Sequence, residues 1–277
     1  RDGGPGWVAP FARTPLGDWC DLGFPVLHHC GGLPLGHGGS MNDGIVSARL
    51  GLKGSPSEAE ESMVIRDILL ARRTGGHVHL AHMSTKGSVE LIRWGKERGI
   101  NVTAEVTPHH LTLTETAVEG YRTAAKMNPP LRTAEDVASL QEAWRDGTID
   151  LVATDHAPHH YDAKDREFAD APFGIVGLET ALALVVTELV ESGMIDFKTL
   201  VDRMSTRPAR LFGLPGGTLA SGSTGDVTVF DPRFAWEVDP ATFLSKGRNT
   251  PYTGKALRGR ARYTVVGGVV VHRAESR

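Results

Sequence analysis

Short apolar segments alternate with amphipathic ones through the middle of the chain. Four segments rich in β-branched residues are apolar enough for burial on both faces, as in the strands of a parallel sheet. We predict strands over residues 23–30, 77–83, 100–106 and 149–155.

The first helix between these strands is predicted over residues 55–76. Ser55 is a suitable N-cap, Pro56 suits the first helical position, and Gly75 is placed to end the helix. Its predicted buried stripe is formed by Val64, Ile68 and Ala71.

Further helices follow the same plan. Val89 and Ile92 are the predicted inward residues of the second helix, and Gly99 is placed to end it. Thr133 and Asp136 have capping-box spacing at the start of the third. A fourth helix is predicted to be long and mostly buried. The second, third and fourth helices are predicted over residues 85–99, 133–147 and 177–193.

Alternating strands and helices imply parallel strands joined by right-handed crossovers, in either an open doubly wound sheet or a (β/α)8 barrel. In both folds the functional site lies at the carboxyl ends of the strands. From residue 215 the pattern changes to a small β module, in which Gly267 and Gly268 form a two-residue hairpin connection. Residues 1–22 and 30–44 lack periodicity and are predicted to be irregular.

Composition excludes several classes of protein. The chain has 277 residues, of which 40% are hydrophobic, and a formal net charge of −3, so it can bury a large core and offers no polybasic surface to nucleic acid or anionic lipid. No apolar run approaches membrane-spanning length, and the first residues lack the features of a signal peptide. The two cysteines, Cys20 and Cys30, are too few for a disulfide framework, which favours a reducing cytoplasm.

Three good metal ligands fall at the ends of predicted strands. His29 ends the first strand, His82 the second and Asp155 the fourth, so these residues are expected to converge on one rim of the sheet. Imidazole and carboxylate are the ligands that Zn²⁺ takes at catalytic sites, where three protein ligands leave a position for water. A lone histidine at a strand end is more often a hydrogen-bonded core residue, but three ligands together favour a metal site.

The neighbouring histidines are expected to have other roles. His28, His77 and His79 alternate along their strands in ways that point them elsewhere, and they are predicted to be structural or surface residues. His156 and His160 are given no catalytic role.

Five motifs, in a fixed order, carry a resemblance to a known family: VHLAHMSTKGSVELIR, VTAEVTPHHLTL, KMNPPLR, ATDHAPH and APFGIVGLET. Together with the C-terminal GRNTPYTGKALRGRARYTVVGGVVVH, they resemble the second half of a bacterial dihydroorotase of the amidohydrolase superfamily, over nearly everything from Met41 to His272. Dihydroorotases are zinc enzymes that interconvert (S)-dihydroorotate and N-carbamoyl-L-aspartate in pyrimidine biosynthesis. The resemblance therefore implies hydrolysis of a cyclic amide.

The same resemblance implies roles for individual residues. His29 and His82 match metal-binding histidines, and Asp155 matches the aspartate that binds metal and shuttles the proton. His109 and His110 match no metal ligand and are predicted to form supporting hydrogen bonds. One or two zinc ions are the implied cofactor. Positions that match substrate contacts are Asn128, His159 and the backbone of Phe173 and Gly174.

Some elements of the family pattern are missing. Its first metal motif, H-x-H followed by an arginine that grips the substrate carboxylate, has no counterpart before His29, and the bridging aspartate or modified lysine of the fourth strand is also absent. Where the family has C-E-D after this histidine, the chain has Cys30, Gly31 and Gly32. The expected α/β fold is a partial (β/α)8 barrel holding strands five to eight. The expected domains are an irregular segment 1–22, the partial barrel 23–214 and a C-terminal β module 215–277.

Two functions from different classes stay open. In the first, the chain is a dihydroorotase acting on a small-molecule substrate, impaired in this form, with allantoinase and hydantoinase as neighbouring chemistries. In the second, it is a non-catalytic homologue that serves as a structural partner of aspartate transcarbamoylase. The retained His29, His82 and Asp155 favour the first, and the missing ligands favour the second. A homo-oligomer is a further expected assembly.

Overall fold

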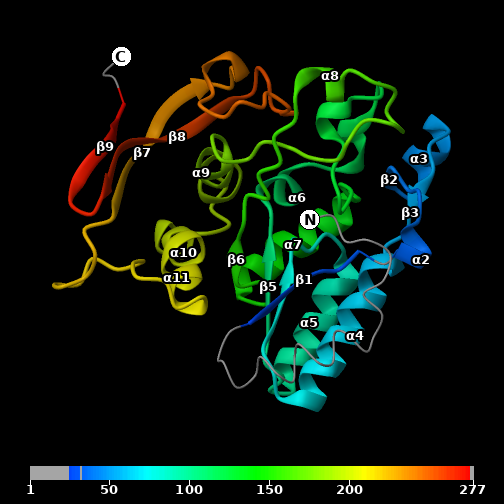
Figure 1. Ribbon diagram of the computed structural model, residues 1–277, viewed down its shortest axis with the longest axis horizontal. Helices are drawn as coiled ribbons and strands as arrows, with labels where there is room; N and C mark the ends of the chain where they lie inside the picture. Colours follow the sequence, from blue (N-terminus) through cyan, green and yellow to red (C-terminus); the bar gives the residue numbers. More distant parts are fainter. Residues whose placement is uncertain (1–24, 32, 275–277) are drawn as a thin grey trace.

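The computed structural model describes residues 25–31 and 33–274, so the predicted irregular segment 1–22 lies outside the described residues. All four predicted strands are present and form one parallel sheet in the order β1-β4-β5-β6 (Figure 1). Their bounds are β1 Val26–His29, β4 Val78–Ala81, β5 Val102–Val106 and β6 Leu151–Val152. The parallel sheet confirms the predicted α/β class.

The main core lies between this sheet and the helices that connect its strands. Val64, Ile68 and Ala71, the predicted stripe of the first helix, are all buried, and they share one core with Leu80 and Ala104 of the sheet. Burial of a large aliphatic side chain contributes about 1.5–3 kcal/mol, so this layer holds the strands in place. The helices that supply it are α4 (Glu58–Thr74), α5 (Lys86–Glu97) and α7 (Ala134–Asp146).

The start of α4 differs from the prediction. Ser57 and not Ser55 is the N-cap residue, and Ser55 lies in the two-residue strand β3 (Gly54–Ser55). The carbonyl of Ser55 accepts a hydrogen bond from the backbone N–H of Asp43, which holds this stretch extended and delays the helix. The predicted end is confirmed, since Gly75 has a left-handed φ of 76°.

The starts and ends of the next helices are as predicted. At the start of α7, the hydroxyl of Thr133 accepts from the N–H of Asp136, and the Asp136 carboxylate accepts from the N–H of Thr133. In α5, Val89 and Ile92 are buried, and Gly99, just beyond its end, has a φ of 68°.

Residues 30–44 were predicted to be irregular, and this is wrong in part. Helix α2 (Leu33–Gly36) and strand β2 (Met41–Asn42) form within them, β2 pairs in parallel with β3, and helix α3 (Ile45–Leu50) follows. Strands of two residues are too short to show an alternating pattern, so periodicity could not reveal them.

Several helices follow β6 before the last sheet begins. The helix predicted over residues 177–193 begins at Ala181, as α9 (Ala181–Val185), and continues directly into the π-helical η3 (Val186–Val190). Within the part of the chain that the structure describes, no helix combines the length and the apolar character needed to cross a membrane. The remaining short helices are α6 Pro108–Thr112, η1 Glu115–Val118, η2 Thr123–Ala125, α8 Tyr161–Lys164, α10 Phe197–Val201, η4 Asp202–Thr206, α11 Arg207–Leu211 and η5 Pro240–Thr242.

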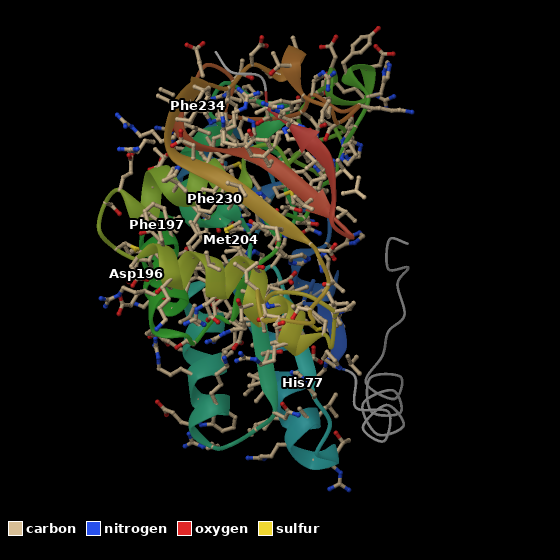
Figure 2. The ribbon with its side chains drawn as sticks, turned by 90° about the vertical axis from the view of Figure 1, so that its left-hand side faces the viewer. His77, Asp196, Phe197, Met204, Phe230 and Phe234 are labelled. Atoms are coloured by element: carbon tan, nitrogen blue, oxygen red, sulfur yellow. The ribbon has the colours of Figure 1, made fainter. Side chains whose placement is uncertain are left out.

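A three-stranded antiparallel sheet ends the described chain. Gly267 and Gly268 connect its last two strands with φ values of 57° and 81°, which confirms the predicted two-residue hairpin. Phe197 of α10 and Phe230 of the first strand have ring centroids 6.2 Å apart, so this sheet packs on the helices that follow β6 (Figure 2). Its strands, in the order β7-β8-β9, are β7 Val227–Glu237, β8 Ala256–Val266 and β9 Val269–Arg273.

Candidate metal and substrate site

His29 and His82 lie side by side at the carboxyl ends of neighbouring strands. The register of β1 and β4 places Ala81 opposite His29, so His82 follows where β1 ends. The two ring centroids are 4.4 Å apart, with the ring planes at 78°. The side-chain nitrogen Nδ2 of Asn128 lies 3.5 Å from Nε2 of His29. Two predicted metal ligands and one predicted substrate contact are thus brought together.

Both imidazoles are neutral near pH 7. Burial and the neighbouring His82 ring lower the pKa of His29 to about 4, although part of His29 is exposed. Burial also lowers the pKa of His82, against the opposing effect of the Glu105 carboxylate. A neutral imidazole keeps a nitrogen lone pair free, and this is the form that binds a metal ion.

Asp155 lies in the connection after β6 and is half-buried. Burial raises its pKa, and the carboxylate of Glu105 adds to this effect, whereas His29 lowers it. Asp155 in turn raises the pKa of His29. This mutual influence agrees with the predicted position of both residues on one rim of the sheet.

The side chain of His82 provides a test of whether a metal ion fits the site. Its Nδ1 is buried and has no hydrogen-bond partner among the described residues, which costs about 1–3 kcal/mol for a typical polar atom. A bound metal ion would satisfy this nitrogen, so the residues fit such an ion. The ligand atoms of His29, His82 and Asp155 do not, however, all lie within 4.8 Å of one another. In the described part of the chain, a different group of three residues meets this distance.

That trio is His28, Cys30 and Asp67, and it lies on the opposite face of β1 from His29. Nδ1 of His28 is 2.5 Å from Oδ2 of Asp67, and Nη2 of Arg66 is 2.7 Å from Oδ1 of Asp67. Burial raises the pKa of the Cys30 thiol well above its usual value. Because Asp67 is already paired on both oxygens, we assign the trio to the attachment of β1 to α4, which agrees with the structural role predicted for His28.

The predicted substrate contacts beyond Asp155 also come together. Nε2 of His159 lies 2.8 Å from the carbonyl oxygen of Phe173. Gly174 has a φ of 144°, and a Cβ there would lie 2.8 Å from Nε2 of His159 and from Cβ of Ala157, so the site requires glycine. The amide of Asn249 donates to the carbonyls of Ala157 and Gly174. Its Oδ1 accepts from the N–H of His159.

Asn249 was missed as a contributor to the site. It lies in the C-terminal motif GRNTP, about 75 residues from the segment that it holds, and no local pattern connects the two. The resemblance of that motif to the family was the available signal, and it gave no role to the individual residue.

Glu60 is a second residue that sequence reasoning missed. Its buried carboxylate accepts from the backbone N–H of Ser84 at 3.0 Å, from the N–H of Thr85 at 3.2 Å and from the Ser88 hydroxyl at 2.6 Å. Ser84 and Thr85 follow His82 closely, so Glu60 fixes the connection that carries this ring. In the sequence Glu60 is one of several acids in the first turn of α4, a position that is usually solvated.

A polar chain runs along one face of β4 and β5. Nε2 of His79 lies 3.1 Å from Oε2 of Glu105, and Nδ1 of His79 lies 2.8 Å from the Thr103 hydroxyl. The same hydroxyl is 2.8 Å from Nε2 of His77. The predicted structural roles of the two histidines agree with these contacts, and Glu105 connects the chain electrostatically to Asp155.

His109 and His110, which follow β5, were both predicted to form supporting hydrogen bonds, and this holds for His110. His110 has Nδ1 2.7 Å from the Thr107 hydroxyl and Nε2 2.9 Å from the carbonyl oxygen of Pro129, next to Asn128. Nε2 of His109 is buried and has no hydrogen-bond partner in residues 25–31 and 33–274. His110 therefore supports the turn that presents Asn128.

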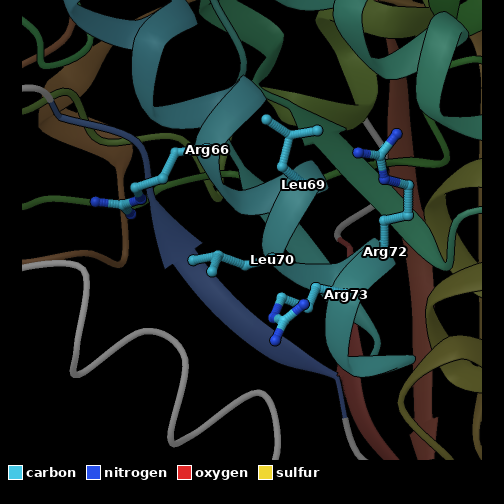
Figure 3. A pocket seen from close by; sticks show the side chains of 5 residues that line it. All are labelled: Arg66, Leu69, Leu70, Arg72 and Arg73. Carbon is cyan, nitrogen blue, oxygen red and sulfur yellow. The ribbon is translucent and has the colours of Figure 1, made fainter.

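A pocket of about 550 Å³ lies along α4 (Figure 3). All its lining residues come from this one helix, and none is a predicted site residue. The pocket has no contribution from the ends of the strands, so we place the candidate site at the strand rim instead. The lining residues are Arg66, Leu69, Leu70, Arg72 and Arg73.

A parallel sheet with histidines and an aspartate at its strand ends is typical of metal-dependent hydrolases built on barrels. The sequence model of the amidohydrolase family matches residues 23–271. The chain therefore belongs to the amidohydrolase family.

Relatives in this family are similar over almost the whole chain. A protein named dihydroorotase from Pelotomaculum thermopropionicum is 54% identical over 270 residues, which are 98% of this chain and 63% of the relative. A dihydroorotase from Geobacter metallireducens is 49% identical over 272 residues, 98% of this chain and 64% of the relative. These alignments reach well into residues 1–22, so the resemblance extends further than the motifs indicated. The chain spans less than two thirds of the length of these relatives.

Solved structures agree on the fold. The D-hydantoinase (dihydropyrimidinase) from Thermus sp. superposes with a TM-score of 0.86 at 27% identity, covering 97% of this chain and 61% of that one. The dihydropyrimidinase from Brevibacillus agri gives a TM-score of 0.83 at 26% identity, covering 95% of this chain and 60% of that one. This coverage agrees with the predicted partial barrel followed by a C-terminal β module.

Proposed function

We propose that the chain carries the second half of a dihydroorotase, which interconverts (S)-dihydroorotate and N-carbamoyl-L-aspartate in pyrimidine biosynthesis. The observation that carries this proposal is the neutral pair His29 and His82, 4.4 Å apart, with the buried Nδ1 of His82 unsatisfied. The relatives named dihydroorotase, which share 54% and 49% sequence identity with this chain, favour dihydroorotate among the cyclic amides.

In this proposal, His29, His82 and Asp155 hold zinc, which when bound activates water and polarises the amide carbonyl. Each imidazole offers a nitrogen lone pair because burial keeps it neutral. Whether one or two ions bind depends on ligands that these three residues do not supply. Zinc is preferred among metals because the set combines imidazole nitrogen with carboxylate oxygen.

Asp155 takes the proton of the attacking water and returns it to the leaving ring nitrogen. Asn128, His159 and the backbone of Phe173 and Gly174 bind the substrate. Two contacts support this grouping: that of Asn128 with His29 and that of His159 with Phe173.

The remaining parts of the proposal concern organisation. We retain 23–214 as the partial barrel and 215–277 as the β module. A cytoplasmic location rests on the low cysteine count, and a homo-oligomer stays an expected assembly.

A second function, as a non-catalytic structural partner of aspartate transcarbamoylase, is favoured by one observation. The three proposed ligands are gathered less tightly than a preformed metal site requires. A structural partner needs no metal, which separates the two functions experimentally.

The test is the zinc content of the purified chain, measured by inductively coupled plasma mass spectrometry after dialysis against buffer with micromolar zinc. We expect close to one zinc per chain, falling to a small fraction in His82→Ala. Asp162→Ala, which changes an exposed carboxylate, is the matched control and should keep the zinc. Zinc absent from the unaltered chain, or unchanged in His82→Ala, would contradict the proposed site.

A further inference from the structure

Lys164 is a buried lysine whose ammonium contacts carbonyl oxygens. Its Nζ lies 2.8 Å from the carbonyl of Pro172, 3.0 Å from that of Thr123 and 3.4 Å from that of Lys126. An ammonium has three N–H donors, and here all three have an acceptor. These acceptors come from two segments that are more than 40 residues apart in the sequence.

Lys126 is buried as well, and it connects the same two parts of the chain. Its Nζ donates to the carbonyl of Phe168 at 2.6 Å and to that of Ala169 at 2.8 Å. The same ammonium lies 4.7 Å from the centre of the Phe173 ring, within the range of a cation–π contact. Lys126 therefore connects the segments 123–128 and 168–174 from within the first, and Lys164, which lies in neither, contacts carbonyl oxygens of both.

Burying these two lysines costs free energy. Burial of a charge without a paired counter-charge is unfavourable, and in the described part of the chain neither ammonium forms a salt bridge. Burial and the neighbouring Lys126 lower the pKa of Lys164 to about 8, and burial lowers that of Lys126 against the effect of Asp170. The hydrogen bonds of both ammonium groups go to backbone carbonyls, and Lys126 adds its contact with the Phe173 ring.

The two connected segments carry the proposed substrate contacts. Asn128 follows Lys126 by two residues, and Phe173 and Gly174 lie at the end of the second segment. The carbonyl of Lys126 accepts from the backbone N–H of Gly174 at 2.9 Å as well as from Lys164. The position of the Gly174 backbone relative to Asn128 is thus set by this shared carbonyl oxygen, together with the contacts that the two ammonium groups make with the segments.

We propose that Lys164 and Lys126 are positioning residues that fix the segment of Asn128 against the segment of Phe173 and Gly174, so that the substrate meets a preformed pocket wall. The hydrogen bonds support the connection between the two segments, and its benefit for substrate binding rests on the proposed function. Lys164→Met keeps an unbranched side chain, one atom shorter, and removes the ammonium donor from three carbonyl oxygens, of which that of Lys126 keeps only the N–H of Gly174. The segments should then separate locally while the sheet stays intact.

The direct test is hydrogen–deuterium exchange of the 277-residue chain, read by mass spectrometry on peptides. In Lys164→Met and Lys126→Met we expect protection in peptides covering 123–128 and 168–174 to fall at least tenfold, with peptides of β4 and β5 unchanged. Lys198→Met, at an exposed lysine of α10, is the control and should change neither. Unchanged protection in both segments would overturn the proposal, and so would an equal loss across all peptides.

A second measurement tests whether the two lysines assist substrate binding. It uses a longer protein in which the N-terminal part of the Pelotomaculum dihydroorotase is fused to the start of this chain. Lys164→Met should raise the KM for dihydroorotate at least tenfold and change kcat by less than threefold, because the substrate contacts move and the metal ligands do not. A fall in kcat with KM unchanged would overturn the positioning role. If the longer protein without the substitution turns over no dihydroorotate, the proposed function is contradicted. The hydrogen–deuterium exchange measurement still tests whether the two lysines hold the segments together.

Discussion

His82 and Asp155 share an unusual backbone conformation: both have left-handed φ values, 41° and 45°, although neither is glycine. A non-glycine residue in this region costs about 1–3 kcal/mol, and such residues cluster at functional sites. His82 directly follows β4, and Asp155 lies in the connection after β6. The two proposed ligands are thus held at the strand rim by backbone conformations that the surrounding packing imposes.

The first prediction concerns Asp155→Asn. The amide is isosteric with the carboxylate, so we expect the free energy of unfolding to change by less than about 1 kcal/mol. Loss of the proton acceptor should reduce dihydroorotate turnover by about 10²–10⁴-fold in a protein with a complete barrel. Turnover and urea unfolding measure the two effects separately.

Asp162→Asn is the control for this change, because Asp162 is exposed and, among the ionisable groups that the structure describes, pairs only with the exposed His160. It should leave both turnover and stability as they were. Turnover in Asp155→Asn equal to that of the control would remove Asp155 from the mechanism.

The second prediction concerns Gly174→Ala. The new Cβ would meet His159 and Ala157 at 2.8 Å in a backbone region that side chains rarely adopt, so we expect destabilisation by about 1–3 kcal/mol. Gly193→Ala is the matched control, because Gly193 has a positive φ of 76° but open space around it. A loss in Gly174→Ala no larger than that in the control would show that the close approach has no energetic weight.

The third prediction concerns Glu60→Ala. Removal of this carboxylate leaves the N–H groups of Ser84 and Thr85 without an acceptor, at about 1–3 kcal/mol for each buried group. We expect thermal unfolding at a clearly lower temperature. Glu58→Ala changes an exposed acid in the same turn and should have little effect. Equal melting temperatures for the two variants would contradict the assigned role.

The fourth prediction concerns pH. Burial lowers the pKa of His110 to about 4, and that of His109 is lowered well below its usual value, whereas histidine in the unfolded chain titrates near 6.5. Between these values the unfolded state binds more protons, so stability should fall as the pH drops from 6.5 toward 4. In His110→Gln the fall should be shallower. Parallel stability–pH curves for parent and variant would refute this.

Patterns within one element were predicted well. The stripe of Val64, Ile68 and Ala71, the capping box of Thr133 and the glycine hairpin after β8 all depend on residues close in sequence, and each is confirmed. The start of α4 was placed too early, because the pairing that holds Ser55 extended comes from another segment.

Contacts between distant segments could not be predicted. Glu60 acts on Ser84 across 24 residues, and Asn249 acts on Gly174 across 75, so no spacing rule connects them. The candidate ligands were found because parallel strands end at one rim, which follows from topology alone. Which polar side chains support that rim depends on packing that only the structure reveals.

We propose that this chain holds part of a dihydroorotase site and that turnover requires the N-terminal part of its relatives. Imprecise positioning of the substrate alone can cost about 10²-fold in rate. The most direct measurement is dihydroorotate turnover by the 277-residue chain beside the longer protein that carries the first four strands of the Pelotomaculum relative, at matched zinc. We predict turnover by the longer protein at least 10²-fold above that of this chain; equal turnover by the two would contradict the account.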